Sequence, residues 1–262
     1  LPSPRTMTAP VLVTGADGAL GQAVVSALEA TPFPVIIHAG RSDGDLTDEN
    51  ACRALVAENT PRAVINAAGR TYGDVAELWA ANLLIPVRLA DAITKVGLGT
   101  RLVVVGSAAE YGLAAHAGLR LREDAPCRPN SDYGLSKLAA GRAVAAMGIN
   151  HCVARVFNLI DPHAHSRALL PRVKAAIDEG GRLPPDAGAV RDWVTVEFVA
   201  GALAALATID HAPAVVNVCS GEGRSAAEIL GASAHLTPAA MSWSVGDPHL
   251  LEECTGLRAT AA

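Results

Sequence analysis

Three glycines stand directly after the first predicted strand, in the stretch TGADGALGQ. The apolar run PVLVT at 10–14 precedes them and an amphipathic pattern over 19–30 follows them. Gly15 allows a sharp turn, Gly18 leaves room for the backbone to approach a pyrophosphate, and Gly21 lets the helix pack closely on the strand. Because a helix N-terminus offers free N–H groups and a positive dipole end, the stretch predicts a phosphate-binding loop. A plain strand-to-helix turn is the alternative explanation of such a triplet.

Short apolar runs alternate with longer helical patterns along the rest of the chain. The further predicted strands are 34–38, 63–66, 101–106, 151–157 and 214–219, and the further predicted helices are 47–58, 74–96, 132–147, 167–179, 195–208 and 225–231. Runs such as VLV and VVV are apolar on both faces, which is typical of a parallel sheet covered by helices on each side. The alternation predicts an α/β fold with a doubly wound parallel sheet.

This fold predicts three regions along the chain. We expect a flexible N-terminal arm over residues 1–9 and a dinucleotide-binding domain over 10–157. A small substrate-binding lobe over 158–262 follows, interleaved with the last strands of the sheet.

Composition narrows the expected partners. The chain has 262 residues, a formal net charge of −5 and five scattered cysteines. Without a basic patch or an apolar stretch of the ~18 residues that a spanning helix needs, we expect neither nucleic acid nor a membrane as partner. Scattered cysteines without a CxxC pair are typical of reduced thiols, so we expect a cytoplasmic protein, a monomer or homodimer, that acts on a small molecule.

An ordered series of motifs follows the glycine loop. They are GDLTD (44–48), INAAG (65–69), GSAAEYG (106–112), YGLSK (133–137), ARVFN (154–158) and RDWVTVEFVAGAL (191–203). Together with the GxxGxxG spacing, the series resembles the extended short-chain dehydrogenase/reductase family, which holds nucleotide-sugar epimerases, dehydratases and related reductases. The resemblance runs from about Pro10 to Leu257 and implies a Rossmann sheet with a small, shortened C-terminal substrate lobe. In the family, INAAG corresponds to the segment of the fourth strand.

The resemblance implies roles for individual residues. Ser107, Tyr133 and Lys137 match the family's catalytic serine and its Y-x-x-x-K pair, and Ser107, Asn158 and Arg191 match substrate-binding positions. The implied coenzyme-binding residues are Gly15, Asp17, Gly18, Ala19, Leu20, Gly21, Arg41, Asp45, Leu46, Ala67, Ala68, Gly69, Asn82, Tyr133 and Lys137.

The chemistry of the YGLSK pair fits these roles. Tyr133 and Lys137 lie four residues apart on a predicted helix and so share one face. An ammonium group nearby would lower the pKa of the phenol, ordinarily ~10, and let it exchange a proton with a carbonyl or alcohol. Ser107 could hydrogen-bond the same oxygen while nicotinamide carries the hydride.

We expect no bound metal ion. We interpret HAHS at 163–166 as a loop over the substrate mouth.

The end of the second predicted strand bears on the choice of coenzyme. NAD-preferring sites carry an acidic residue there that binds the ribose 2′-OH, whereas this chain has His38 and Ala39. Arg41 could meet a 2′-phosphate, and Asp43 is the acidic alternative. We therefore expect NADPH, with NADH as the alternative.

Departures from the family pattern bear on the substrate. Ala108 and Ala109 stand where dehydratases carry Asp-Glu, which argues against a dehydratase. Ser244 stands where the second of two diphosphate-binding arginines is expected, and Asp161 replaces a usual glycine. Loss of a bidentate phosphate ligand weakens diphosphate binding, so we expect free UDP and dTDP to bind weakly. Arg191 could instead pair with a neighbouring carboxylate, Asp192 or Glu197.

These motifs predict an NAD(P)H-dependent ketoreductase with Tyr133 as proton donor. Its expected substrate is a small ketone, such as a deoxysugar or a secondary metabolite of antibiotic biosynthesis. The alternative is a nucleotide-sugar 4-epimerase with tightly bound NAD. A nucleotide sensor without turnover would not need Ser107, Tyr133 and Lys137 together.

Overall fold

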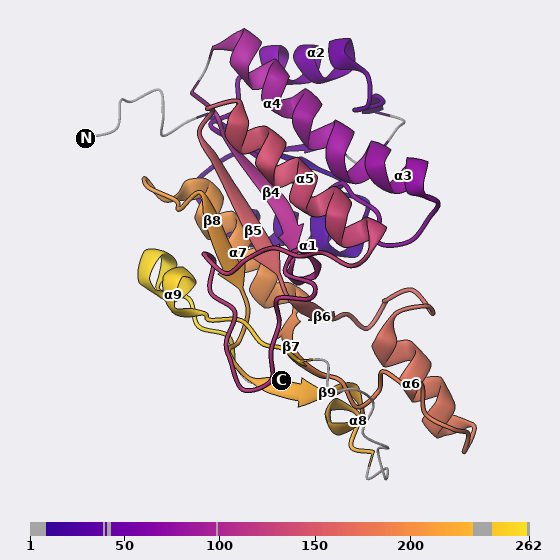
Figure 1. Cartoon of the computed structure of the whole chain (residues 1–262). Coiled ribbons are helices and arrows are strands. Elements are labelled where there is room, and N and C mark those ends of the chain that lie inside the picture. Colours follow the sequence, from indigo (N-terminus) through magenta and orange to yellow (C-terminus); the bar gives the residue numbers. More distant parts are fainter. Residues whose placement is uncertain (1–8, 39, 41–42, 98, 233–242, 261–262) are drawn as a thin grey trace.

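A six-stranded parallel sheet forms the centre of the molecule. The computed structural model describes residues 9–38, 40, 43–97, 99–232 and 243–260 (Figure 1), so residues 1–8 of the predicted arm lie outside it. The strand order is β2-β1-β3-β4-β5-β8, with every pair parallel. The strands are β1 (Val11–Thr14), β2 (Val35–His38), β3 (Ala63–Asn66), β4 (Arg101–Ser107), β5 (His151–Val156) and β8 (Val215–Val218).

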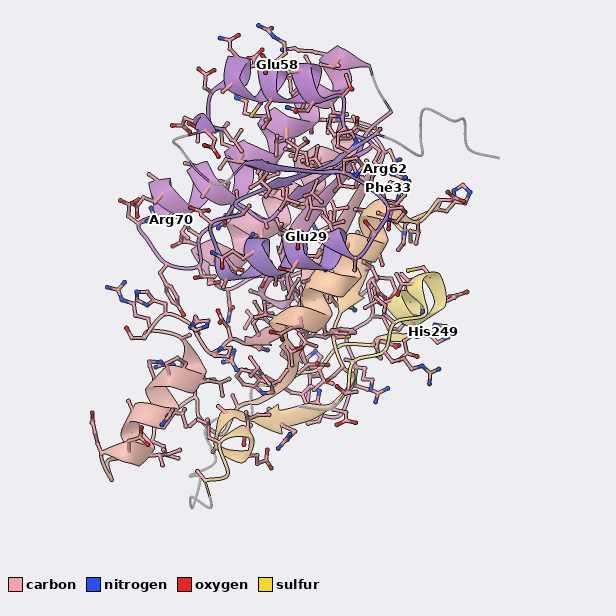
Figure 2. The ribbon with its side chains drawn as sticks, turned by 180° about the vertical axis from the view of Figure 1, so that it is seen from behind. Glu29, Phe33, Glu58, Arg62, Arg70 and His249 are labelled. Atoms are coloured by element: carbon pink, nitrogen blue, oxygen red, sulfur yellow. The ribbon has the colours of Figure 1, made fainter. Side chains whose placement is uncertain are left out.

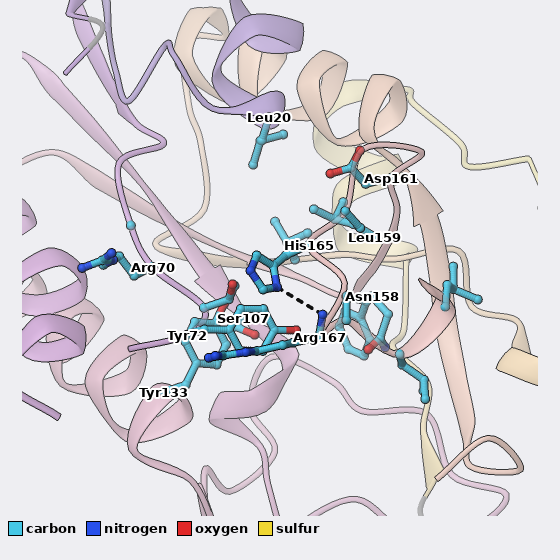
Figure 3. A pocket seen from close by; sticks show the side chains of 18 of the residues that line it. Leu20, Arg70, Tyr72, Ser107, Tyr133, Asn158, Leu159, Asp161, His165 and Arg167 are labelled. Atoms are coloured by element: carbon cyan, nitrogen blue, oxygen red, sulfur yellow. Dashed lines mark hydrogen bonds between the residues drawn. The ribbon is translucent and has the colours of Figure 1, made fainter. Parts of the chain in front are cut away.

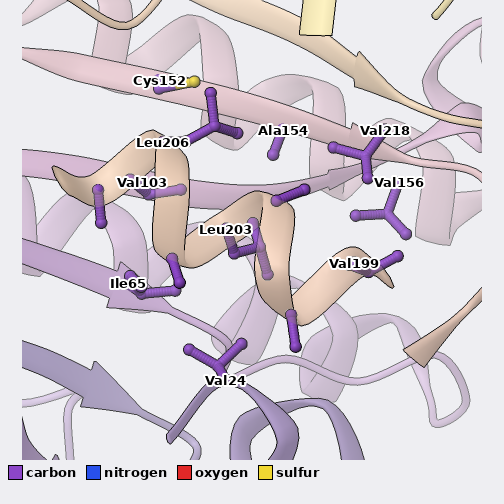
Figure 4. Close-up of a cluster of buried hydrophobic side chains, with 14 of the residues drawn as sticks. Val24, Ile65, Val103, Cys152, Ala154, Val156, Val199, Leu203, Leu206 and Val218 are labelled. Carbon is purple, nitrogen blue, oxygen red and sulfur yellow. The ribbon is translucent and has the colours of Figure 1, made fainter. Parts of the chain in front are cut away.

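Helices cover both faces of this sheet (Figures 1 and 2). One face carries α1 (Ala19–Glu29) and α7 (Val196–Thr208); the other carries α2 (Glu49–Asn59), α4 (Ile85–Val96) and α5 (Asp132–Ala146). The side chains of β1 alternate between the two faces, because Val11 and Val13 join the core under α1 and α7 while Leu12 joins the opposite core. Val24 of α1 and Leu203 of α7 belong to the first of these cores (Figure 4). Each such buried aliphatic side chain contributes about 1.5–3 kcal/mol. This arrangement confirms the predicted doubly wound parallel sheet.

The sheet reverses its direction of growth at β1. The chain passes from β1 to β2 on one side, then crosses to β3 on the other side, and the later strands add beyond β3. In open α/β sheets, ligands bind beyond the carboxyl ends of the strands at such a reversal. INAAG, which matches the family's fourth-strand segment, begins in β3, the third strand along this chain, and continues past its carboxyl end.

The predicted helix 74–96 is divided into three segments. They are α3 (Val75–Trp79), a π-helical stretch η3 (Ala80–Leu84) and α4. Pro86 has no N–H to donate to the carbonyl of Asn82, four residues earlier, and the local winding widens at that point. The predicted helix is therefore confirmed over residues 75–96, and its π-helical stretch contains Asn82, a residue of the predicted site.

A second, small sheet lies beyond the carboxyl ends of the main strands. It contains β6 (Asn158–Ile160), β7 (Val190–Thr195), β9 (Gly223–Ser225) and β10 (Trp243–Ser244), and the short helix α8 (Ala226–Ile229) follows β9. Helix α6 (Leu169–Asp178) projects beside it, and α9 (His249–Thr255) returns to pack on α7 and β8 (Figure 1).

The division of the chain into a dinucleotide-binding domain and a substrate-binding lobe after residue 157 stays a prediction. Within the described ranges, no helix combines the length and the apolarity needed to cross a membrane.

The close packing of α1 on β1 leads to a prediction about two glycines. A Cβ on Gly21 would overlap the carbonyl of Gly15, whereas a Cβ on Gly201, inside α7, would meet nothing within 4 Å. We expect Gly21→Ala to lower the free energy of unfolding by about 3 kcal/mol or more. Gly201→Ala should raise it by about 0.5–1 kcal/mol, because alanine loses less entropy in a helix. Urea denaturation measures both, and equal effects would contradict the packing argument.

Candidate active site

Two adjoining cavities open along the carboxyl edge of the main sheet. The first, of about 660 Å³, is lined by the glycine loop, the segment after β2 and the segment after β3. The second, of about 600 Å³, lies between the ends of β4 and β5 and the second sheet. Both are lined by Ala67, Gly69 and Arg70, so they meet at the end of β3.

The first cavity has the features of a dinucleotide cradle. Gly15 has a φ of +71°, and a Cβ there would stand 2.5 Å from the backbone nitrogen of Ala68. Gly18 is the N-cap of α1, with no side-chain hydrogen bond capping the helix, so the first-turn N–H groups stay available for an anion. The residues present therefore fit the pyrophosphate of a dinucleotide.

Most of the predicted coenzyme residues line these cavities. Gly15, Asp17, Gly18, Asp45, Leu46, Ala67, Ala68 and Gly69 line the first; Leu20, Tyr133 and Lys137 line the second. Ala19 lines neither, and Gly21 packs against the Gly15 carbonyl instead. Arg41, on which the NADPH expectation depends, lies outside the described residues.

Asn82 differs from its predicted placement as a coenzyme contact. Its side chain is buried and lines neither cavity. The Oδ1 atom accepts the N–H of Arg70 at 2.9 Å, and Nδ2 donates to the Arg70 carbonyl at 2.9 Å and to Ser136 Oγ at 3.1 Å. The amide therefore fixes the segment after β3 to helix α5.

The structure brings Ser107, Tyr133 and Lys137 together in the wall of the second cavity (Figure 3). Ser107 ends β4, and its Oγ accepts the N–H of Ala109 at 3.2 Å. Tyr133 lies in the first turn of α5, and Lys137 follows one turn later. The ammonium of Lys137 is buried and donates to the Val105 carbonyl at 2.9 Å.

Burial shifts the two titrating side chains in opposite directions. It lowers the pKa of Lys137 to about 8, against the opposing charge of Glu110. It raises the pKa of Tyr133, and a hydrogen bond with Ser107 only partly offsets that rise. Our expectation that the ammonium lowers the pKa of the phenol is wrong for this structure. The Lys137 Nζ lies 6.0 Å from the Tyr133 ring centroid and is directed to the Val105 carbonyl.

A buried ion pair lies directly behind Ser107, and sequence reasoning missed it. Glu110, 1% exposed, accepts the N–H of Ser107 at 2.9 Å through one oxygen and Arg155 Nε at 2.9 Å through the other. Arg155 also donates to the Tyr111 hydroxyl at 3.0 Å. Glu110, the only charged residue of the motif GSAAEYG, was the sequence signal that could have indicated this pair. The pair fixes the backbone of Ser107.

Arg191 lines the second cavity, and its Nε–H donor has no partner. Its Nε is buried without a hydrogen-bond partner, and Nη1 donates to Asn158 Oδ1 at 3.5 Å. Burial lowers its pKa, because no carboxylate compensates the charge fully. The alternative pairing with Asp192 is wrong: that carboxylate accepts the N–H groups of Ser220 and Gly221 at 2.7 and 2.8 Å. Among the ion pairs of the described residues, none joins Arg191 to Glu197.

Other arginines line the cavity whose edge carries Ser244 and Arg191. Ser244 lies opposite Arg191 in the register of β10 and β7. Arg167 and Arg172 line the same cavity from the segment around the start of α6. Arg172 pairs with Asp186 at 2.7 Å, and the second oxygen of Asp186 is buried without a partner. Several arginines therefore surround this end of the cavity.

The HAHS segment contributes to the cavity wall. His165 lines the second cavity, and its ring lies 5.4 Å from that of Tyr72. In the part of the chain that the structure describes, no group of three or more His, Cys, Asp or Glu side chains is placed to hold a metal ion.

The lowered pKa of Lys137 predicts a pH dependence of stability. Its pKa is about 8 in the folded chain against an ordinary value of 10.5. Between these values the unfolded chain binds a proton that the folded chain lacks, so this group makes the free energy of unfolding rise with pH. Lys137→Met should remove that rise, which amounts to about 3 kcal/mol at most. Urea denaturation from pH 7 to 10.5 tests this, with the exposed Lys174→Met as control. Parallel profiles for the wild type and Lys137→Met would contradict it.

Comparison with known proteins agrees with this geometry. The NAD dependent epimerase/dehydratase family model matches residues 11–219. The dTDP-6-deoxy-L-talose 4-dehydrogenase (NAD(P)(+)) of Kitasatospora kifunensis is 31% identical over 165 residues, which cover 59% of this chain and 52% of that protein. The matched stretch thus spans about half the length of this relative.

Solved structures match nearly the whole chain. The structure of RMD from Pseudomonas aeruginosa complexed with NADPH has a TM-score of 0.78 and 27% identity, covering 97% of this chain and 94% of that one. The UDP-glucose 4-epimerase of Thermus thermophilus in complex with NAD has a TM-score of 0.78 and 25% identity, with the same coverage. The chain therefore belongs to the NAD dependent epimerase/dehydratase family, which confirms its resemblance to the extended short-chain dehydrogenase/reductases and the expectation of an NAD(P)-dependent enzyme of that type.

Proposed function

We propose that this chain is an NAD(P)H-dependent ketoreductase that reduces a keto group on the sugar of a nucleotide-linked deoxysugar. The observation that carries the proposal is the meeting of Ser107, Tyr133 and Lys137 in a cavity that adjoins a dinucleotide cradle. When bound, nicotinamide would supply the hydride. The chain's own residues would bind the substrate oxygen and deliver the proton.

The proton chemistry follows from the two shifted pKa values. A reductase needs a protonated donor, and burial raises the pKa of Tyr133, which keeps the proton on the phenol. Ser107 Oγ and the Tyr133 hydroxyl would both donate hydrogen bonds to the substrate oxygen, and Tyr133 would then transfer its proton. Lys137 would add the positive charge of an ammonium to the same cavity, held by the Val105 carbonyl 6.0 Å from the ring centroid of Tyr133.

The charge in the second cavity supports a diphosphate-linked substrate. A buried donor without a partner, such as Arg191 Nε, carries a desolvation cost until an acceptor binds it. Arg167 adds positive charge nearby, whereas Arg172 is paired with Asp186. The Kitasatospora kifunensis relative is, by its name, a dehydrogenase of a dTDP-linked deoxysugar. We therefore extend the expected small ketone to one that carries a nucleotide.

Two further features refine the proposal. Ala108 and Ala109 offer no acid for the elimination of water, which favours reduction over dehydration. We propose NADPH as the preferred coenzyme because no acidic residue ends β2, and the similar RMD structure contains NADPH. NAD that stays bound through dialysis would instead favour the alternative 4-epimerase.

Removing the phenol tests the proton donor. Tyr133→Phe should lower turnover by about 10²–10⁴-fold, the usual contribution of a general acid. Steady-state kinetics with NADPH measures the loss, and fluorescence titration should show unchanged coenzyme binding. Turnover close to that of the wild type would assign the proton transfer to another group.

The arginine cluster predicts binding of free nucleoside diphosphates. Calorimetric titration with dTDP, UDP and GDP should give micromolar binding of at least one of them. Arg191→Ala should weaken it about tenfold or more, because charge-assisted hydrogen bonds contribute about 1.5–3 kcal/mol. Arg182→Ala, which removes an exposed arginine outside the cavity, should leave it unchanged. Weak binding of all three would favour a ketone without a nucleotide, as the serine at 244 predicts.

A further inference from the structure

Aromatic side chains gather at the second cavity although they are scarce in this chain. Only 3% of the residues are aromatic, yet four of them line this cavity: Tyr72, Tyr133, Phe157 and Trp193. Phe157 and Trp193 are 3% and 4% exposed, so packing explains them. Tyr72 is 38% exposed, and its ring is available to a ligand.

The loop that carries Tyr72 is fixed at both ends. At its start, the buried amide of Asn82 binds both backbone groups of Arg70 and ties them to Ser136, on the helix of Tyr133. At its end, Asp74 caps α3 by accepting the N–H of Glu77 at 2.8 Å. Tyr72 is therefore held beside Tyr133 by the scaffold, although no core packing requires its ring there.

A histidine from the other half of the molecule supports the ring of Tyr72. His165, in the loop between β6 and α6, lies with its centroid 5.4 Å from that of Tyr72, at an interplanar angle of 37° (Figure 3). Its Nδ1 accepts the N–H of Arg167 at 3.1 Å, and its carbonyl accepts the N–H of Ala168 at 2.8 Å. The two rings form a continuous surface, which we name the aromatic wall, between the segment after β3 and the second sheet.

We infer that the aromatic wall, Tyr72 supported by His165, is the surface on which the reacting sugar ring of the substrate packs. This inference rests on the proposed function, since it requires a substrate with a sugar ring. Sugar rings present C–H groups on their faces, and these pack on the faces of aromatic side chains. The wall stands beside Ser107 and Tyr133 (Figure 3), and Arg191, from β7, lines the same cavity.

The proposal assigns two kinds of recognition to different residues of this cavity. The arginines would bind the diphosphate of any nucleotide, with or without a sugar. The aromatic wall would select the sugar and hold its keto carbon before the phenol of Tyr133. Tyr72 is thus a specificity-determining residue, and its loss should affect a nucleotide sugar but not a free nucleotide.

A comparison of two ligands tests the aromatic wall. We would titrate dTDP and dTDP-6-deoxy-L-talose into the wild type, Tyr72→Leu and Tyr72→Phe by calorimetry. Tyr72→Leu should raise the dissociation constant of the nucleotide sugar about tenfold and leave that of dTDP unchanged. Tyr72→Phe, which keeps the ring, should restore wild-type affinity.

The supporting histidine has a matched control in the same loop. His165→Leu should weaken nucleotide-sugar binding in the same direction by a smaller factor, and His163→Leu, two residues away and outside the cavity wall, should not. Equal weakening of dTDP and its sugar derivative by Tyr72→Leu would overturn the inference, as would unchanged binding of both. A wild type that binds none of dTDP, UDP, GDP and dTDP-6-deoxy-L-talose would overturn the proposed function along with it.

Discussion

The close contact between the glycine loop and the segment after β3 determines where everything else in the site lies. Thr14 Oγ1 donates to Asn66 Oδ1 at 2.7 Å across the carboxyl ends of β1 and β3, where the sheet reverses. Immediately beyond, a side chain on Gly15 would collide with the backbone of Ala68. Because these backbones touch, the cradle under α1 and the cavity at the ends of β4 and β5 share one wall, the segment that follows β3. A hydride donor and its acceptor need such adjoining chambers.

A second constraint fixes the side of the site that carries Ser107. The Glu110–Arg155 pair is buried between β4 and β5, and Tyr111 extends it to β8 through a 2.7 Å hydrogen bond to Asn217. Buried ion pairs gain little stability over apolar residues, yet loss of one partner costs about 3–5 kcal/mol. The Glu110–Arg155 pair is therefore better explained by the positions that it fixes than by a gain in the free energy of folding. It ties three strands together at the point where the Ser107 N–H must be held.

Strong periodicity made parts of the fold predictable from the sequence. Strand 63–66 was predicted at its observed bounds and strand 10–14 to within one residue, because their apolar runs are buried on both faces. The strands β6 and β10 are three and two residues long, too short to produce a pattern. Spacing likewise placed Tyr133 and Lys137 on one face of α5, but spacing carries no information about burial. The predicted direction of the phenol pKa was therefore wrong, since burial and the charge of Glu110, from a different element, both raise it.

A buried guanidinium group without a partner and an exposed aromatic ring, both in the second cavity, support the proposed substrate. A folded protein normally satisfies its buried polar groups, yet Arg191 Nε is buried without a partner in the wall of the second cavity. Apolar rings are normally covered, yet Tyr72 is anchored in an exposed position beside the phenol of Tyr133. An anion would satisfy the guanidinium, and a ring with C–H faces would cover the tyrosine. A nucleotide sugar carries both groups in one molecule, whereas a plain ketone would leave the arginine unsatisfied.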